Sequence, residues 1–232
     1  MKRQFWGKVI LLMSIMTICA CGGSNDDTSD IVLADIGNIR VNGVMRVSSA
    51  NRDKVIDLYK QLIVASMGDP GIINFDIMES VTDSNQLIMF QTWRNQEAFD
   101  KHCQTEHVNS IMPQIQRYIE LVDGKEFTIE SMDDIDPDKP FRFNVLMRSD
   151  NREEYVKIVR PVIREVRQRD EGNMGYDLYR SLTNPHEALL VEIWENRLAL
   201  VKHLNSDHFL EARKKTKGLV SKQQYLARMQ EE

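Results

Sequence analysis

Two stretches of the chain decide the fold: residues 90–102, FQTWRNQEAFDKH, and residues 191–203, VEIWENRLALVKH. They lie 101 positions apart, and at that separation the tryptophan, asparagine, alanine, lysine and histidine of one superpose on those of the other. Each begins with β-forming residues and continues, after an asparagine, into helix-forming residues, which is typical of a strand that enters a helix. Self-similarity at a fixed separation indicates a duplicated structural unit.

The duplication extends beyond these two stretches. Residues 71–82 share a glycine, an aspartate, a serine and a threonine with residues 172–183, and in both copies a second histidine follows the first by five residues. An acidic segment that contains prolines, residues 133–140, is typical of a linker. We therefore expect a first domain over residues 38–132 and a second domain over residues 141–232.

The pattern within each copy predicts the element order βαββαβ. An amphipathic helix follows the first strand, and a helical stretch follows the third strand. The expected strands cover residues 41–47, 72–80, 86–93 and 127–132 in the first copy and residues 141–147, 175–181, 187–194 and 225–229 in the second. This order is that of the ferredoxin-like fold, an antiparallel sheet with helices on one face. A single copy would leave its other sheet face bare, so we expect an α+β chain whose two tandem repeats cover each other.

The first 20 residues predict an export signal rather than part of the fold. Lys2, Arg3 and Lys8 precede an apolar run of about 12 residues, which is too short to span a bilayer as a helix. The run ends in Ile-Cys-Ala-Cys, which resembles a bacterial lipobox with Cys21 as the lipidated residue. Residues 21–37 would form a polar tether. The expected location is the outer membrane, with the anchored chain in the periplasm or at the cell surface.

The composition excludes several classes of protein. The chain has 42% hydrophobic and 28% charged residues, which is ordinary for a globular protein. Its 30 Lys and Arg against 35 Asp and Glu give a net charge of -5, so the basic surface of a nucleic-acid-binding protein is not expected. Three cysteines are too few for a disulfide framework. A chain that pairs its own two halves can remain a monomer, although further oligomers stay open.

The glycine turn over residues 71–75, the stretch over residues 90–102 and their counterparts in the second copy resemble the antibiotic biosynthesis monooxygenase (ABM) family. The resemblance covers about residues 38 to 232. Members of this family usually form homodimers whose sheets face one another, so the resemblance implies an intrachain dimeric α+β barrel. The family includes cofactor-independent oxygenases of polyphenols and quinols, haem-degrading enzymes and members without an established reaction.

The resemblance also implies a candidate site in each copy. Trp93 and Trp194 would border a cavity between the sheet and the helices, where an indole can stack on a flat aromatic substrate. A structural role in the core is the alternative for both. His102 and His203 can act as general bases on a phenol, or can join helix and strand by hydrogen bonds.

The remaining candidates come from the strands. Glu192 has Gln91 as its counterpart, so a reaction that needs this acid would run only in the second copy. Phe75, Tyr176 and Asn144 are expected to contact the substrate. An asparagine like Asn144 also occurs in the haem-degrading branch, but other residue types occupy that branch's histidine position in both copies. We therefore expect no haem and no other cofactor.

Metal binding by the histidine pairs is not expected. His107 and His208 follow the first histidines at i+5, about 140° round one continuous helix, which differs from the i, i+4 pair of a zinc-binding helix.

Two functions from different classes stay open. The first is a cofactor-free monooxygenase acting on a small phenol or quinol, with His203 as the base and Trp194 as the stacking wall. The second is a ligand-binding lipoprotein that keeps the barrel without the reaction. The quinone-forming branch uses an asparagine and an arginine where the first copy has Met89 and Pro113, which favours the second function. In both cases the expected partners are a small aromatic molecule and, through the lipid anchor, a membrane.

Overall fold

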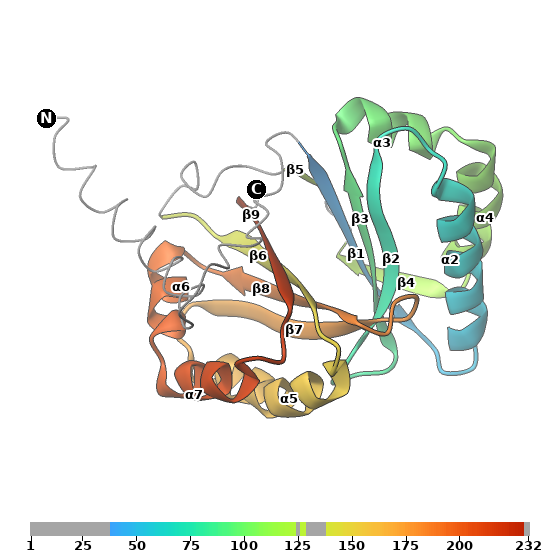
Figure 1. Cartoon of the computed structure of the whole chain (residues 1–232). Helices are drawn as coiled ribbons and strands as arrows, with labels where there is room; N and C mark the ends of the chain where they lie inside the picture. The colour runs from blue at the N-terminus through green and yellow to red at the C-terminus, as the bar shows by residue number, and fades with distance from the viewer. Residues whose placement is uncertain (1–37, 124–125, 129–137, 230–232) are drawn as a thin grey trace, which may run out of the picture. The chain divides into compact units, whose positions relative to one another are not determined.

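The predicted element order occurs twice in the computed structural model, which describes residues 38–123, 126–128 and 138–229 (Figure 1). These residues all belong to one unit of the chain, Val32–Glu232. The expected signal peptide, the lipidation site Cys21, the tether over residues 21–37 and most of the linker lie outside the described residues. No helix in the described part is both long and apolar enough to cross a bilayer.

Each repeat contains the expected strands and helices. The first repeat consists of β1 (Ile39–Val47), α2 (Arg52–Ser66), β2 (Ile72–Ser80), β3 (Gln86–Trp93), α3 (Gln96–Cys103), α4 (Glu106–Gln116), β4 (Ile119–Asp123) and β5 (Glu126–Thr128). The second repeat consists of β6 (Phe141–Arg148), α5 (Arg152–Arg169), β7 (Asn173–Ser181), β8 (Glu187–Trp194), α6 (Arg197–Leu204), α7 (Asp207–Thr216) and β9 (Lys222–Met229). The predicted bounds of β2, β3 and β8 are confirmed residue for residue.

The last strand of each repeat begins earlier than predicted. In the first repeat it begins at Ile119 as β4 and continues as β5, and both segments pair with β1. In the second repeat β9 begins at Lys222 and pairs with β6 along its whole length. The prediction was wrong because pairing with the first strand of the repeat, and not the local apolar pattern, sets where this strand begins.

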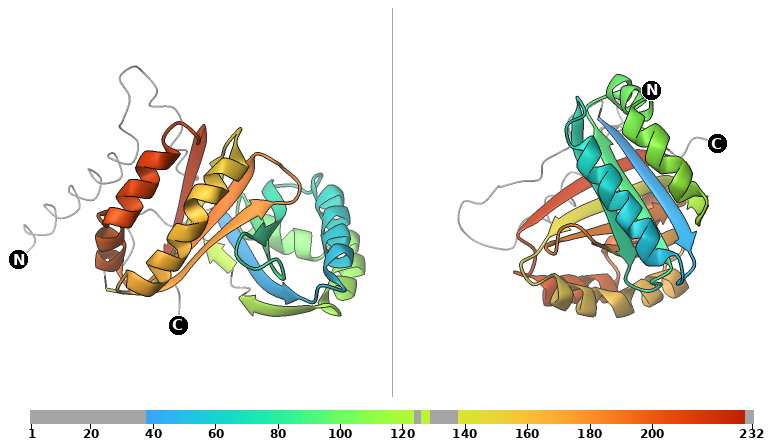
Figure 2. Two further views of the ribbon diagram at one scale, coloured as in Figure 1. Left: turned by 90° about the horizontal axis from the view of Figure 1, so that it is seen from below. Right: turned by 90° about the vertical axis from the view of Figure 1, so that its right-hand side faces the viewer.

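The two repeats share one antiparallel sheet. Its strand order within the described residues is β4-β1-β3-β2-β7-β8-β6-β9, with β5 also on β1. The repeats meet where β2 pairs with β7, and Glu79 lies opposite Arg180 at the centre of that junction. Figure 2 shows α2 and α4 side by side on one face of the first half, and α5 and α7 on one face of the second half.

The sheet face away from the helices is buried by contacts between the repeats. One cluster there combines side chains of both repeats: Val44, Met78, Ile88, Phe90, Tyr179, Leu189 and Val191. Each large side chain removed from water in this way stabilises the fold by about 1.5–3 kcal/mol. The predicted cover of one bare sheet face by the other is therefore confirmed, and the chain forms an intrachain α+β barrel of two ferredoxin-like repeats.

Two glycine turns hold the second helical stretch of each repeat against the sheet. Gly71 has φ +89° and Gly172 has φ +79°, a region that other residues rarely adopt. A Cβ atom at either position would lie 2.5 or 2.6 Å from the Cβ of Ala98 or Ala199. The recurrence of glycine and alanine at the same separation therefore reflects one close contact made twice.

Candidate functional site

The histidine predicted as a base stacks on the predicted tryptophan in both repeats. Asn95 begins α3 by accepting a hydrogen bond from the backbone N–H of Ala98, and Asn196 begins α6 in the same way. These caps fix the first turn of each helix, so the histidine about two turns after the capping asparagine lies over the end of the preceding strand. The ring centroids of Trp93 and His102 are 4.5 Å apart, and those of the pair in the second repeat are 4.9 Å apart.

An aspartate before each glycine turn fixes the tautomer of this histidine. The Nδ1 atom of His102 lies 2.7 Å from Oδ2 of Asp69, and Nδ1 of His203 lies 2.6 Å from Oδ2 of Asp170. Burial lowers the pKa of both histidines, and the aspartate opposes that shift. A neutral imidazole whose Nδ1–H donates to a carboxylate keeps its lone pair on Nε2. That atom is the one available to accept a proton.

The second histidine of each repeat contacts the same aspartate. Nε2 of His107 lies 2.9 Å from Oδ2 of Asp69, and Nε2 of His208 lies 3.0 Å from Oδ1 of Asp170. The prediction that the two histidines diverge by about 140° is wrong, because the helix is not continuous. It breaks after Cys103, and a new helix begins at Glu106. The corresponding break in the second repeat separates α6 from α7.

The carboxyl group predicted as a catalytic acid is buried against the tryptophan of its own strand. Oε2 of Glu192 accepts a hydrogen bond of 2.8 Å from Nε1 of Trp194. In the first repeat Oε1 of Gln91 accepts the equivalent bond, also 2.8 Å, from Trp93. Burial raises the pKa of Glu192 to about 8, so this side chain is mostly protonated at neutral pH.

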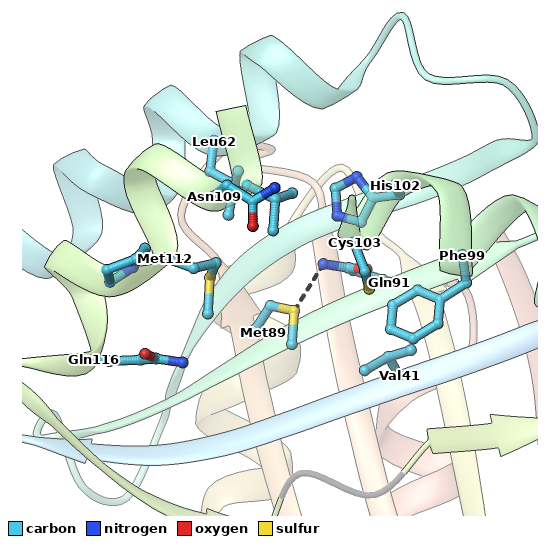
Figure 3. A pocket seen from close by; sticks show the side chains of 12 residues that line it. Val41, Leu62, Met89, Gln91, Phe99, His102, Cys103, Asn109, Met112 and Gln116 are labelled. Carbon is cyan, nitrogen blue, oxygen red and sulfur yellow. Dashed lines mark hydrogen bonds between the residues drawn. The ribbon is translucent and has the colours of Figure 1, made fainter. Parts of the chain in front are cut away.

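A cavity of about 350 Å³ lies between the sheet and the helices of the first repeat (Figure 3). Its polar groups come from His102, Gln91, Asn109 and Gln116, and its apolar wall includes Met89. The other lining residues are Val41, Leu62, Phe99, Cys103, Val108, Met112 and Pro113. This volume suits a ligand of one or two aromatic rings, and a mostly apolar wall with a few polar groups is typical of a small-molecule site.

Two of the positions that line this cavity carry larger side chains in the second repeat. At the position of Val108 the second repeat has Phe209, whose ring centroid lies 4.7 Å from that of His203. Val41 pairs with Gln91, and Phe143 pairs with its counterpart Glu192, so Phe143 occupies the position of Val41 in the second repeat. Phe143 is 4% exposed. Both histidines are almost fully buried, with 3% of the His102 side chain and 0% of the His203 side chain exposed.

The other predicted aromatic residues are buried around the histidines. Phe75 and Tyr176 lie edge-on to the histidines, with ring centroids 6.1 Å from His102 and 5.3 Å from His203. Burial raises the pKa of the Tyr176 phenol well above its ordinary value. Neither tryptophan is exposed at all, and Trp93 lies against His102 rather than among the residues that border the cavity.

Asn144 does not join the site. It pairs with Val191, whose side chain belongs to the core between the repeats, whereas its neighbour Phe143 pairs with Glu192. Successive side chains of a strand point to opposite faces of a sheet. The expectation that Asn144 contacts the same substrate as His203 is therefore wrong.

The sequence reasoning missed the two aspartates. Asp69 and Asp170 lie two residues before the paired glycines and 101 positions apart. The separation itself was the available signal, because an aspartate in the same register as two histidines indicates a shared contact.

Comparison with known proteins identifies the family. The family described as "Antibiotic biosynthesis monooxygenase" matches residues 38–114 and 143–215. An uncharacterized protein from Synechocystis is 31% identical over 74 residues, which are 32% of this chain and 50% of that protein, so the match spans about half the relative's length.

Two solved structures are also similar. A conserved protein of unknown function from Bacteroides thetaiotaomicron is 32% identical and covers 40% of this chain and 97% of its own, with a TM-score of 0.38. A candidate monooxygenase from Lactobacillus acidophilus is 14% identical and covers 82% of this chain and 92% of its own, with a TM-score of 0.39. Because the family matches most of both repeats, the chain belongs to the antibiotic biosynthesis monooxygenase family.

Proposed function

We propose that the chain is a cofactor-independent monooxygenase for a small phenol or quinol and that its first repeat carries the reaction. The observation that supports this proposal is the cavity beside His102, whose equivalent place in the second repeat contains Phe143 and Phe209. Family membership supports the class of reaction. The sequence favoured His203 as the base, and the cavity beside His102 is the reason for proposing the first repeat instead.

The chemistry follows from the tautomer of His102. Its Nε2 accepts the phenolic proton, while Asp69 holds the Nδ1–H and stabilises the imidazolium that forms. The electron-rich phenolate then reduces O2, and a C–O bond forms at a ring carbon. The O–O bond breaks, one oxygen atom remains as a second carbonyl, and the other leaves as water with the two hydrogens of the substrate. One phenol and one O2 give one quinone and one water.

The apolar wall supports a second candidate function, which is ligand binding without chemistry. Met89 and Pro113 line the cavity at the two positions where the quinone-forming branch has an asparagine and an arginine. A wall of this kind binds an aromatic ring without activating O2. In this case the protein would sequester its ligand.

Oxygen uptake distinguishes the two functions. The full chain is incubated aerobically with a panel of hydroquinones, and His102→Gln is compared with His203→Gln as a matched variant in the other repeat. We expect uptake by the wild type, a loss of at least tenfold in His102→Gln, and little change per folded molecule in His203→Gln. Uptake equal to buffer across the panel, with ligand binding retained, would establish the second function.

We also propose that Cys21 carries a lipid that holds the chain at the outer membrane, in the periplasm or at the cell surface. The support is the sequence alone, in which a cationic start and an apolar run end at this cysteine. Cys21→Ser should move the protein from the membrane fraction to the soluble fraction. An unchanged distribution would exclude this anchor.

A further inference from the structure

We propose that each repeat binds one divalent transition-metal ion, such as Zn²⁺ or Fe²⁺, through an aspartate and two histidines. The two groups are Asp69, His102 and His107 in the first repeat and Asp170, His203 and His208 in the second. In each group one oxygen or nitrogen atom per residue lies within 4.8 Å of the others. Binding does not depend on the proposed oxygenase function.

The distances within each group are close to those of a metal site. Zinc binds histidine nitrogen and carboxylate oxygen at about 2.0–2.2 Å, so two ligand atoms at tetrahedral or octahedral angles lie about 3.0–3.4 Å apart. In the first repeat the aspartate oxygen lies 2.7 and 2.9 Å from the two nitrogens. In the second repeat the aspartate oxygens lie 2.6 and 3.0 Å from them. Lengthening these contacts by a few tenths of an ångström would bring the aspartate and each nitrogen to the separation found around a metal ion, and the two nitrogens of a group lie within 4.8 Å of each other.

The donor set also suits such an ion. Two histidines and one carboxylate are ligands of zinc enzymes and of non-haem iron(II) enzymes, and they leave coordination positions open. A hydroxyl also lies close to the nitrogen of the outer histidine that would bind the ion: Oγ1 of Thr105 lies 3.0 Å from Nε2 of His107, and Oγ of Ser206 lies 3.0 Å from Nε2 of His208. When an ion binds, this hydroxyl either loses its contact with the nitrogen or becomes a further oxygen ligand.

The two groups differ in access. The side chains of Asp69 and His107 are 13% and 21% exposed, whereas those of Asp170 and His208 are 8% and 9% exposed. An ion therefore reaches the first group more easily. We expect a rapidly exchanging site in the first repeat and a slowly exchanging site in the second.

One consequence rests on the proposed function. A metal ion on Nδ1 of His102 requires that nitrogen to lose its proton, and the neutral ring then carries its proton on Nε2. The ring can no longer act as a base toward the cavity. Zinc should therefore inhibit oxygen uptake, whereas metal retention is measured whether or not uptake occurs.

The test measures Zn²⁺ retained by the full chain after treatment with a chelator, loading and gel filtration. We expect two ions per wild-type chain, one in His107→Ala, one in His208→Ala and none in the double variant. The control is His186→Ala, because this fifth histidine lies outside both groups and is 43% exposed. Cys103→Ser serves as a second control for binding by thiols, and both controls should retain two ions.

Retention of no ion by the wild type would overturn the proposal, as would two ions in the double variant or a loss in either control. If a variant fails to fold, the Co²⁺ spectrum of the wild type decides instead. Ligand-field bands without a thiolate charge-transfer band are expected for nitrogen and oxygen ligands. Absence of these bands, or a dominant thiolate band, would overturn the proposal equally.

Discussion

The two repeats hold the same histidine, tryptophan and aspartate in nearly the same geometry, but a cavity lies beside them in the first repeat, and two phenylalanines occupy equivalent positions in the second. Between equivalent contacts of the two repeats, the histidine–tryptophan centroid distances differ by only a few tenths of an ångström. The distances from the histidine nitrogens to Oδ2 of the aspartate differ by 0.2 Å or less. What differs is the wall, where Phe143 and Phe209 replace Val41 and Val108. The contacts among histidine, tryptophan and aspartate are therefore a feature of the fold that both repeats share. The side chains that line the cavity are the feature expected to determine which repeat binds a ligand.

The junction between the repeats shows a second difference. Glu79 and Arg180 occupy the same position of the two repeats, and they face each other across β2 and β7. Nε of Arg180 lies 2.6 Å from Oε1 of Glu79, and Oε2 of the same carboxylate pairs with Arg52. In a symmetric dimer of either repeat this position would meet its own copy, so two like charges would lie opposite each other. The duplicated chain favours pairing between unlike repeats.

The largest effect is expected when this difference is removed. Glu79→Arg places a third guanidinium between Arg52 and Arg180 and should lower the free energy of unfolding by about 2–4 kcal/mol, measured by urea denaturation. The control is Arg46→Glu in the exposed ion pair with Asp83, where a loss below about 1 kcal/mol is expected. Equal losses in the two variants would show that the junction charges do not hold the repeats together.

The second prediction concerns the pH dependence of stability, which should differ between Glu192 and its counterpart Gln91. Burial raises the pKa of Glu192 from 4.5 to about 8, so between these values the folded state keeps a proton that the unfolded state has lost. The contribution of this group to stability therefore falls as pH rises from about 4.5 to about 8. Glu192→Gln keeps an acceptor for Trp194 but removes the titrating group. The free energy of unfolding of the variant minus that of the wild type should therefore be larger at pH 8.5 than at pH 5 by on the order of 2–3 kcal/mol.

Thermal and urea unfolding at the two pH values measure this effect, with Gln91→Glu as the matched reverse change. That variant should show little change at pH 5 and a loss of stability at pH 8.5. A stability difference between wild type and Glu192→Gln that does not vary with pH would mean that Glu192 is ionised in the folded protein.

Most strands and helices could be predicted from the sequence because each element has a counterpart in the other repeat that supports its assignment. The paired glycines and tryptophans located the hairpin β2–β3 and its counterpart, and their bounds were confirmed almost throughout. The last strands were placed incorrectly because the first strand of each repeat, which lies far away in sequence, fixes their register. Local patterns contain no information about that distant partner.

The site was predicted in part for a similar reason. His102 and Trp93 came together as expected because a short turn and an asparagine cap connect their elements. The break after Cys103 was missed, and with it the convergence of His107 on Asp69. Which repeat has a cavity depends on the summed volumes of side chains from several elements, and spacing along the chain does not report such volumes.

Replacing Phe143 by a smaller residue tests whether this phenylalanine prevents ligand binding beside His203. Phe143→Val introduces the residue found at Val41 and should cost about 2 kcal/mol of stability, because a buried aromatic ring is replaced by a smaller group. Urea denaturation measures the loss. Small aromatic compounds should then raise the melting temperature of the variant more than that of the wild type. A variant with unchanged stability and no new binding would indicate that the neighbouring side chains close the space.

The smallest effect on stability, and the sharpest effect on function, is expected when the first cavity is filled. Val108→Phe introduces the residue found at Phe209 and should change the free energy of unfolding by less than about 1.5 kcal/mol, because the added ring enters existing space. It should weaken binding of a hydroquinone by at least tenfold, measured by calorimetry. Val64→Phe, at a position on α2 that is 76% exposed, is the matched control and should bind as the wild type does. Equal affinity in both variants would place the ligand outside this cavity, and the contrast between the repeats would then concern packing alone.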